Sequence, residues 1–263
     1  MRRLIIRPGG IGDCILSLPA IEFLRANYTE VWVPSAIVPL IRFAAASPIT
    51  STGIDLLGLA GVNPPPGLIA RLREFDSIVS WYGSNRTEFR ECVRALGLSF
   101  QFLDALPERG AKIHAADFFF QQVGGGGRAV PRIECDPPVR GDFVAIHPFS
   151  GSARKNWPLE RFRELAERLA MPVRWCAGPD ETLESAMRFD DLYELACSLA
   201  SARLYIGNDS GITHLAAAVG VPTIAIFVAS DPEIWAPRGD RVQVLSAQAN
   251  PDVYGIAKSL MSE

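Results

Sequence analysis

Short apolar runs alternate with stretches of helical spacing from one end of the chain to the other. In the first half the pattern predicts strands at 4–7, 30–34, 77–82 and 100–103, and helices at 13–26, 37–46 and 86–96. In the second half it predicts strands at 143–147, 173–176, 204–206, 223–228 and 242–245, and helices at 158–169, 192–202, 211–219 and 253–261. Strands that are apolar throughout, with helices between them, are typical of a parallel sheet covered on both faces.

One segment interrupts this rhythm. Four consecutive glycines at 124–127 are followed by Pro131, Pro137 and Pro138, and this composition favours a linker over 123–141. We therefore expect an α/β fold of two Rossmann-like, doubly wound lobes facing a cleft, with lobes at 1–122 and 142–263. The last helix is free to pack back on the N-terminal lobe. A long surface loop inside one domain is the alternative.

Composition narrows the class of function. The 263 residues are 48% hydrophobic and carry a formal net charge of −3, so we expect no nucleic-acid partner, which would favour a clustered basic surface. Five dispersed cysteines without a CxxC pair predict neither a zinc site nor disulfides, and favour a cytoplasmic location. No apolar run reaches the ~18–20 residues of a spanning helix, so we expect at most peripheral membrane contact.

The segment 205–214 runs from an apolar strand through a small-residue turn into a helix. Asp209 and Ser210 are good helix N-cap residues, and Gly211 permits a close backbone approach. The free amides of a first helical turn attract phosphate, and His214, one turn further on, adds a donor. An ordinary capped helix with a packed histidine is the alternative interpretation.

The segment 147–158 also joins a strand to a helix. Ser150, Gly151 and Ser152 offer hydroxyls and accessible amides, and Arg154 and Lys155 add positive charge suited to a diphosphate. A solvated basic loop is the alternative. Both segments follow predicted strands, so we expect them at the same edge of the second sheet.

Two acidic positions complete the candidate site. Asp13 follows Gly10 and Gly12 at the start of the first helix, where it is either a helix cap or a general base that accepts a proton from an attacking hydroxyl. Asp180 or Glu181 follows another strand, where a carboxylate binds ribose hydroxyls or stabilises a first helical turn. The chain has no DxD triplet, so we expect no metal and no other cofactor.

These segments, in this order, resemble glycosyltransferase family 9, the lipopolysaccharide heptosyltransferases, whose fold is GT-B. The similarity is densest in the first 25 residues and over about 143–240. It rests on 10–13 with Pro19-Ala20, on 147–162, on 177–179, on 207–217, on 220–223 and on Asp231-Pro232. The region 47–142 is shorter than in most members.

The resemblance implies an inverting, metal-independent bacterial enzyme that moves a sugar, first of all heptose from ADP-heptose, to a glycan or lipid-linked acceptor of the cell envelope. It implies that Asp13 is the catalytic base and that Lys155 contacts the phosphates of the donor. It assigns donor contacts to Ser150, Gly151, Ser152, Asp180 or Glu181, Asp209, Ser210, Gly211 and His214. It also implies a location in the cytoplasm, at the cytoplasmic face of the inner membrane for a lipid-linked acceptor.

Two other functions stay open. A degenerate family member would bind the nucleotide-sugar without transferring it, and a GT-B epimerase would need no acceptor. The short N-terminal lobe favours the first of these, and the presence of Asp13 and Lys155 argues against it.

Overall fold

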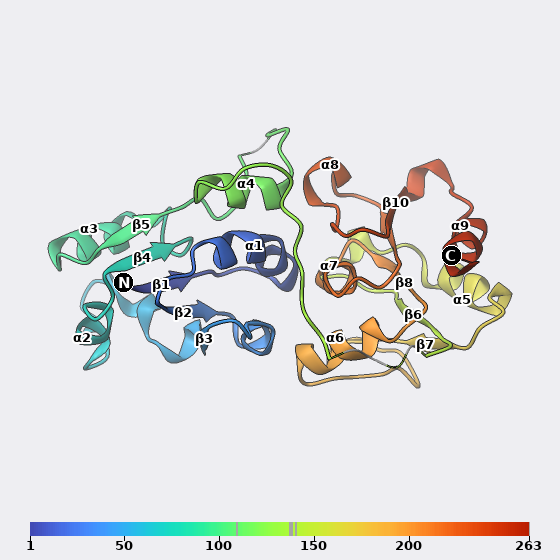
Figure 1. Cartoon of the computed structure of the whole chain (residues 1–263), viewed down its shortest axis with the longest axis horizontal. Helices are drawn as coiled ribbons and strands as arrows, with labels where there is room; N and C mark the ends of the chain where they lie inside the picture. Colours follow the sequence, from blue (N-terminus) through green and yellow to red (C-terminus); the bar gives the residue numbers. More distant parts are fainter. Residues whose placement is uncertain (109, 137–138, 140, 263) are drawn as a thin grey trace.

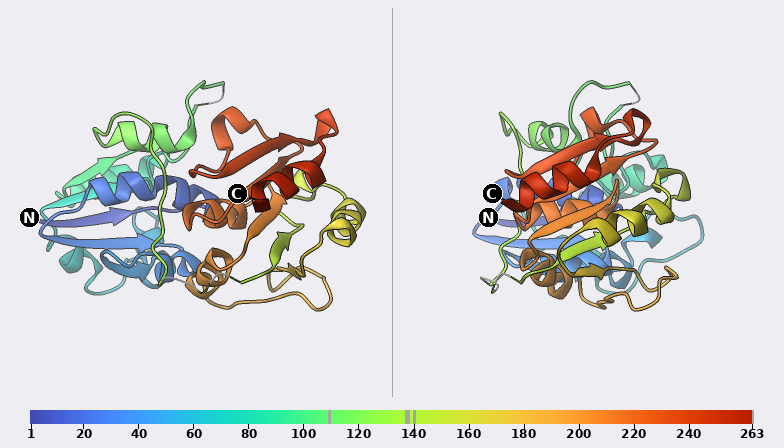
Figure 2. Two further views of the ribbon diagram at one scale, coloured as in Figure 1. Left: turned by 45° about the vertical axis from the view of Figure 1, so that its right-hand side comes forward. Right: turned by 90° about the vertical axis from the view of Figure 1, so that its right-hand side faces the viewer.

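The computed structural model describes residues 1–108, 110–136, 139 and 141–262, arranged as two lobes side by side (Figures 1 and 2). Each lobe is built on one five-stranded parallel sheet. The N-terminal sheet has the order β3-β2-β1-β4-β5, from β1 (Arg2–Ile6), β2 (Tyr28–Val33), β3 (Ala45–Pro48), β4 (Ser77–Ser80) and β5 (Phe100–Phe102). The C-terminal sheet has the order β10-β9-β8-β6-β7, from β6 (Val144–His147), β7 (Val173–Trp175), β8 (Leu204–Asn208), β9 (Thr223–Phe227) and β10 (Val242–Ser246).

The apolar strands supply side chains to both faces of each sheet, as their composition predicts. In β1, Leu4 and Ile6 enter the outer core of the N-terminal lobe, whereas Ile5 between them enters a central core. In β8, Leu204 and Ile206 enter the outer core of the C-terminal lobe, and Tyr205 faces the central core. Successive side chains point to opposite faces of a strand, so each sheet is covered on both sides.

Helices form the layers around these sheets. The outer face of the N-terminal sheet packs with α2 (Leu68–Leu72) and α3 (Thr87–Ala95), and the outer face of the C-terminal sheet packs with α5 (Leu159–Arg168) and α9 (Val253–Ser262). The central core contains α1 (Ile11–Phe23), α4 (Ala115–Gln122), α6 (Leu192–Ala200) and α7 (Gly211–Ala218). Because this core draws on both lobes, they are packed against each other and not merely tethered.

In Figure 1 the described part of the segment expected to link the lobes runs between them after α4. Ala129 and Ile133 are buried in the central core, and the Ile133 amide donates to the carbonyl of Ala218 in the second lobe at 3.0 Å. Residues 137, 138 and 140, which include two of the three prolines, lie outside the described residues.

Three local expectations differ from the structure. The helix expected at 37–46 is a 3₁₀ helix, η1 (Ser35–Leu40), followed by strand β3, because Pro39 has no amide hydrogen for a continuing helix. Helix α4 was not expected at all. The last helix, α9, does not pack on the N-terminal lobe: Val253, Ala257 and Leu260 are buried in the outer core of the C-terminal lobe, next to α5.

Polar contacts also join the lobes beside α4. Arg238 forms a bidentate ion pair with Asp117, with N–O distances of 2.5 and 2.6 Å, and donates to the carbonyl of Ala129 at 3.0 Å. The Nε2 atom of His114 lies 2.9 Å from the carbonyl of Ala236. These contacts hold α4 against the second lobe. None of the described helices has the length and apolar character required to cross a bilayer.

Candidate active site

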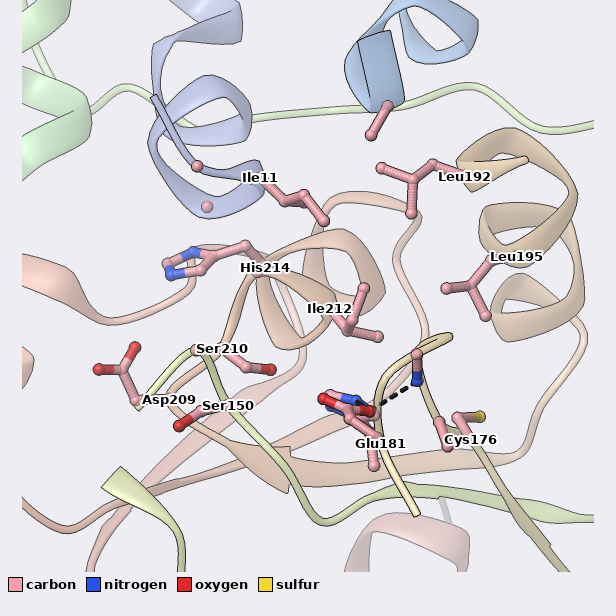
Figure 3. Close-up of a pocket in the computed structure, with 18 of the residues that line it drawn as sticks. Ile11, Ser150, Cys176, Glu181, Leu192, Leu195, Asp209, Ser210, Ile212 and His214 are labelled. Carbon is pink, nitrogen blue, oxygen red and sulfur yellow. Dashed lines mark hydrogen bonds and ion pairs between the residues drawn. The ribbon is translucent and has the colours of Figure 1, made fainter. Parts of the chain in front are cut away.

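The candidate site lies where the carboxyl ends of the two sheets face each other. In each sheet the strand order reverses beside the central strand, between β1 and β4 and between β6 and β8. Parallel sheets of this kind bind ligands beyond the carboxyl ends of the strands at such a reversal. A cavity of about 720 Å³ occupies this place (Figure 3). Of the predicted site residues it is lined by Asp13, Ser150, Gly151, Ser152, Lys155, Glu181, Asp209, Ser210, Gly211 and His214.

Two helices begin at this cavity and touch at their first residues. A Cβ atom added to Gly211 of α7 would lie 2.6 Å from Cβ of Ile11 and 3.0 Å from the amide nitrogen of Gly12, both in α1. A Cβ added to Gly12 would lie 3.0 Å from Cδ2 of His214. Glycine is therefore required for this approach. The N-termini of α1 and α7 both line the cavity, and such termini favour bound anions through their free amides and dipoles.

Asp13 sits in the first turn of α1. Its Oδ2 atom accepts a hydrogen bond from the amide of Gly10 at 3.0 Å, so the carboxylate caps the helix. The expected role as a general base would fall to the same carboxylate. Behind it, the buried Arg7 donates through Nη2 to the carbonyl of Asp13 at 3.1 Å and through Nε to Oγ of Ser17 at 3.0 Å. Burial lowers the pKa of Arg7, and the Asp13 carboxylate opposes that shift. Asp13 is thus fixed at the cavity wall through two hydrogen bonds, one from Gly10 to its carboxylate and one from Arg7 to its backbone carbonyl.

Lys155 and Asp209, which also line the cavity, form an ion pair. The ammonium lies 2.7 Å from Oδ2 of Asp209, which also accepts a hydrogen bond from Oγ of Ser230. The Asp209 side chain is 5% exposed and that of Lys155 is 39% exposed. The ion pair therefore joins a buried carboxylate to a lysine side chain that is partly open to solvent.

The loop 150–152 is held to the α7 turn by a residue that sequence reasoning did not select. Asn208, the last residue of β8, donates to the carbonyl of Pro148 at 2.7 Å and accepts from the amide of Trp157 at 2.9 Å. Ser150 turns its hydroxyl into the loop, toward the carbonyl of Ser152 and Oδ1 of Asn156, both at 2.8 Å. Its hydroxyl hydrogen is thus used within the loop, which leaves the oxygen as an acceptor.

The structure separates the two acidic candidates after β7. Asp180 is exposed and does not line the cavity, whereas Glu181 does. The Glu181 carboxylate accepts from Nε2 of His147 at 3.0 Å and from the amide of Gly178 at 2.6 Å. Burial raises the pKa of Glu181, but these two hydrogen bonds outweigh it, and the net effect is a lowered pKa. The carboxylate is therefore ionised and fixed at neutral pH.

His214 is buried one turn into α7, between the two lobes. Desolvation lowers its pKa to about 4, although the carboxylates of Asp209 and Asp13 favour the charged form. Its Nδ1 atom is buried without a hydrogen-bond partner in the described structure. At neutral pH the ring is therefore uncharged, and it offers shape and one hydrogen bond to a ligand but no positive charge.

The far end of the cavity is apolar, and sequence reasoning did not find it. Figure 3 shows Leu192 and Leu195 of α6 and Cys176 after β7 at this end, opposite Asp209 and Ser150. In the sequence these residues have the apolar character of ordinary core positions. The spacing of apolar residues is the same whether a helix face packs in a core or lines a cavity. Among the described residues, no three His, Cys, Asp or Glu side chains gather as metal ligands.

Comparisons with known proteins identify relatives. A lipopolysaccharide heptosyltransferase 1 of Pseudomonas aeruginosa is 33% identical over an alignment of 93 residues, and the match covers 30% of this chain and 26% of that protein. A protein of the same name from Escherichia coli is 28% identical over 131 residues, 43% of this chain and 40% of that protein. The matched region spans less than half the length of these curated relatives.

The fold has a close structural counterpart. The Escherichia coli ADP-heptose lipopolysaccharide heptosyltransferase II superposes with a TM-score of 0.74 at 16% identity, covering 100% of this chain and 99% of that one. This likeness shows that the two lobes form a GT-B fold. The model of glycosyltransferase family 9 (heptosyltransferase) matches residues 121–255, just over half of the chain. The chain therefore belongs to glycosyltransferase family 9, the heptosyltransferase family.

Proposed function

We propose that this protein transfers a sugar from a nucleoside diphosphate sugar, first of all ADP-heptose, to a hydroxyl of a glycan or lipid-linked acceptor of the cell envelope. The observation that carries the proposal is the cavity between the lobes, where two helix N-termini meet. Asp13 of the N-terminal lobe and Lys155 of the C-terminal lobe both line this cavity. The named relatives and the structural counterpart are heptosyltransferases, and the counterpart is named for ADP-heptose.

The donor would lie along the cavity with its base at the apolar end. Leu192, Leu195 and Cys176 offer the flat, uncharged surroundings that suit a purine. Glu181 would accept hydrogen bonds from the ribose, as a carboxylate does in other doubly wound sheets. The diphosphate would then reach the start of α7, where the amides of Gly211 and Ile212 come too early in the helix to have an intrahelical acceptor.

Lys155 would neutralise the leaving diphosphate together with these amides, without a metal ion. Its ammonium is partly exposed and can turn from Asp209 toward a phosphate oxygen, while Asp209 keeps its hydrogen bond from Ser230. Fixed positive charge placed where negative charge develops is a large contribution to catalysis in a site shielded from water. The basic loop interpretation of Lys155 is less favoured, because the side chain reaches into the cavity.

Asp13 would act as the general base. Its carboxylate accepts the proton of the acceptor hydroxyl while that oxygen attacks the anomeric carbon, and the bond from this carbon to the diphosphate oxygen breaks. The base lies on the lobe opposite Lys155, so the hydroxyl would arrive from the side away from the diphosphate. A single displacement of this kind inverts the anomeric configuration. With a lipid-linked acceptor, the protein would work at the cytoplasmic face of the membrane.

Two measurements test the proposal. A ligand that binds only the folded state raises stability, by about 2.7 kcal/mol at a hundred times its Kd, so ADP-heptose should raise the melting temperature more than UDP- or GDP-sugars do. Asp13→Asn should abolish transfer and leave ADP affinity within about twofold, because a base acts only in the transition state. An equal loss of both would make Asp13 structural. Donor binding without any transfer would favour the degenerate binding protein, and an altered sugar without acceptor would favour the epimerase.

A further inference from the structure

His147 makes a contact that the proposed reaction has not used. It is the last residue of β6, an interior strand of the C-terminal sheet, and its side chain is only 5% exposed. Its Nε2 atom lies 3.0 Å from Oε2 of Glu181. An ionised carboxylate only accepts hydrogen bonds, so Nε2 of this histidine must carry the hydrogen.

Both hydrogen bonds to the Glu181 carboxylate fall on the same oxygen. Oε2 receives the His147 ring and the amide of Gly178, at 3.0 and 2.6 Å. Within the described structure no hydrogen bond is made to Oε1. The carboxylate is therefore anchored through one oxygen, and the other remains available to a ligand in the cavity.

The other ring nitrogen of His147 has no comparable role. Nδ1 is buried and has no hydrogen-bond partner among the described residues. The ring thus contributes one donor, at a position fixed by the strand, and its edge packs toward Phe149 with ring centroids 6.2 Å apart. A side chain that supplied only the Nε2 donor would satisfy the same geometry.

We propose that His147 is a positioning residue for the donor: its Nε2–H holds the Glu181 carboxylate so that Oε1 accepts hydrogen bonds from the ribose hydroxyls. This role rests on the proposed function, because it acts on the ribose of a nucleotide donor. Orientation by a buried neighbour fixes the rotamer of a ligand-binding side chain, which otherwise loses entropy on binding. His147 therefore affects ribose recognition through Glu181 and has no contact of its own to the sugar.

The test compares ADP with 2′,3′-dideoxy-ADP, which lacks both ribose hydroxyls, by calorimetric titration. His147→Leu removes the donor, and we expect its Kd for ADP to rise about tenfold, the effect of one charge-assisted hydrogen bond, with the Kd for the dideoxy analogue little changed. His147→Gln keeps a donor at the place of Nε2 and should restore ADP affinity. In a Glu181→Ala background the leucine substitution should have no further effect. In transfer assays the KM for the donor should rise with kcat unchanged.

Several outcomes would overturn this role. An equal loss of both ligands in His147→Leu would indicate a general structural role, as would a failure of glutamine to restore ADP binding. Discrimination between the two ligands that persists in His147→Leu would refute the positioning role alone and leave the proposed function intact. If the wild-type protein binds neither ligand, both the nucleotide donor and this role are wrong. Melting temperatures of each variant show whether the fold is preserved.

Discussion

The contact between α1 and α7 gives the sharpest prediction, through the substitution Gly211→Ala. The new Cβ would lie 2.6 Å from Cβ of Ile11 and 3.0 Å from the backbone nitrogen of Gly12. Carbon atoms in contact sit about 3.5–4.0 Å apart, so the two helices must separate by roughly 1 Å. Alanine suits a helix better than glycine does, and Gly211 has no left-handed φ, so the substitution brings no backbone strain of its own.

A separation of this size would act on two measurable quantities. Overpacking costs about 1–3 kcal/mol of unfolding free energy. A displacement of about 1 Å between Asp13 and the donor would lower the rate of transfer about a hundredfold. ADP release in the presence of acceptor measures the rate, and urea denaturation measures the stability.

Gly126→Ala is the matched control for this substitution. An added Cβ there meets no atom within 4 Å, and the residue has no left-handed φ, so we expect both quantities to stay at the wild-type values. If Gly211→Ala behaves like this control, the close approach of the two helices does not set the geometry of the site.

Three further predictions follow from charges in the structure. Lys155→Met should weaken ADP binding about tenfold or more, since a charge-assisted bond to phosphate is lost, and unchanged affinity in a titration would exclude its phosphate role. Asp117→Asn leaves the largely buried Arg238 without its ion pair and should cost about 2 kcal/mol in urea denaturation, less than the loss from a fully buried pair. Acid should destabilise the protein through His214, because burial lowers its pKa from about 6.5 in the unfolded chain to about 4 in the folded protein, so the unfolded chain binds the proton first. That contribution is intact above pH 6.5 and falls by about 3 kcal/mol toward pH 4, and equal stability at pH 7 and 4.5 would contradict it.

Much of the fold could be predicted from local patterns, and the exceptions have local causes. Strands β6, β8 and β9 are mostly apolar and are buried at every residue, which is the pattern that predicts a parallel sheet from sequence. Strand β3 is short and only partly buried, and the apolar residues before it mimic a helix until Pro39 interrupts it. Helix α4 contains three consecutive phenylalanines, a run that no helical period singles out, and its position depends on packing against α1.

Some residues of the candidate site could likewise be predicted from the sequence, and others needed the structure. The start of α7 is recognisable in the sequence because glycine and capping residues between a strand and a helix mark a helix N-terminus, as at Ser210 and Gly211. The choice between Asp180 and Glu181 needed the structure, because the conformation of the loop decides which of two adjacent side chains points into the cavity. His147 and Asn208 were missed as well, since their roles lie in hydrogen bonds to residues 34 and 60 positions away.

The two glycines Gly12 and Gly211 are visible in the sequence, but only the tertiary structure shows that they lie in contact. The sequence alone determined two parallel sheets, a glycine-rich break between them, and helix starts suited to anions, because propensity, capping and periodicity act over a few residues. The tertiary structure decided that two such starts touch, that Asp13 and Lys155 line one cavity, and that α9 belongs to the second lobe. Those outcomes depend on how whole layers pack, and the burial of surfaces far apart in the chain leaves no local pattern in the residues that make them.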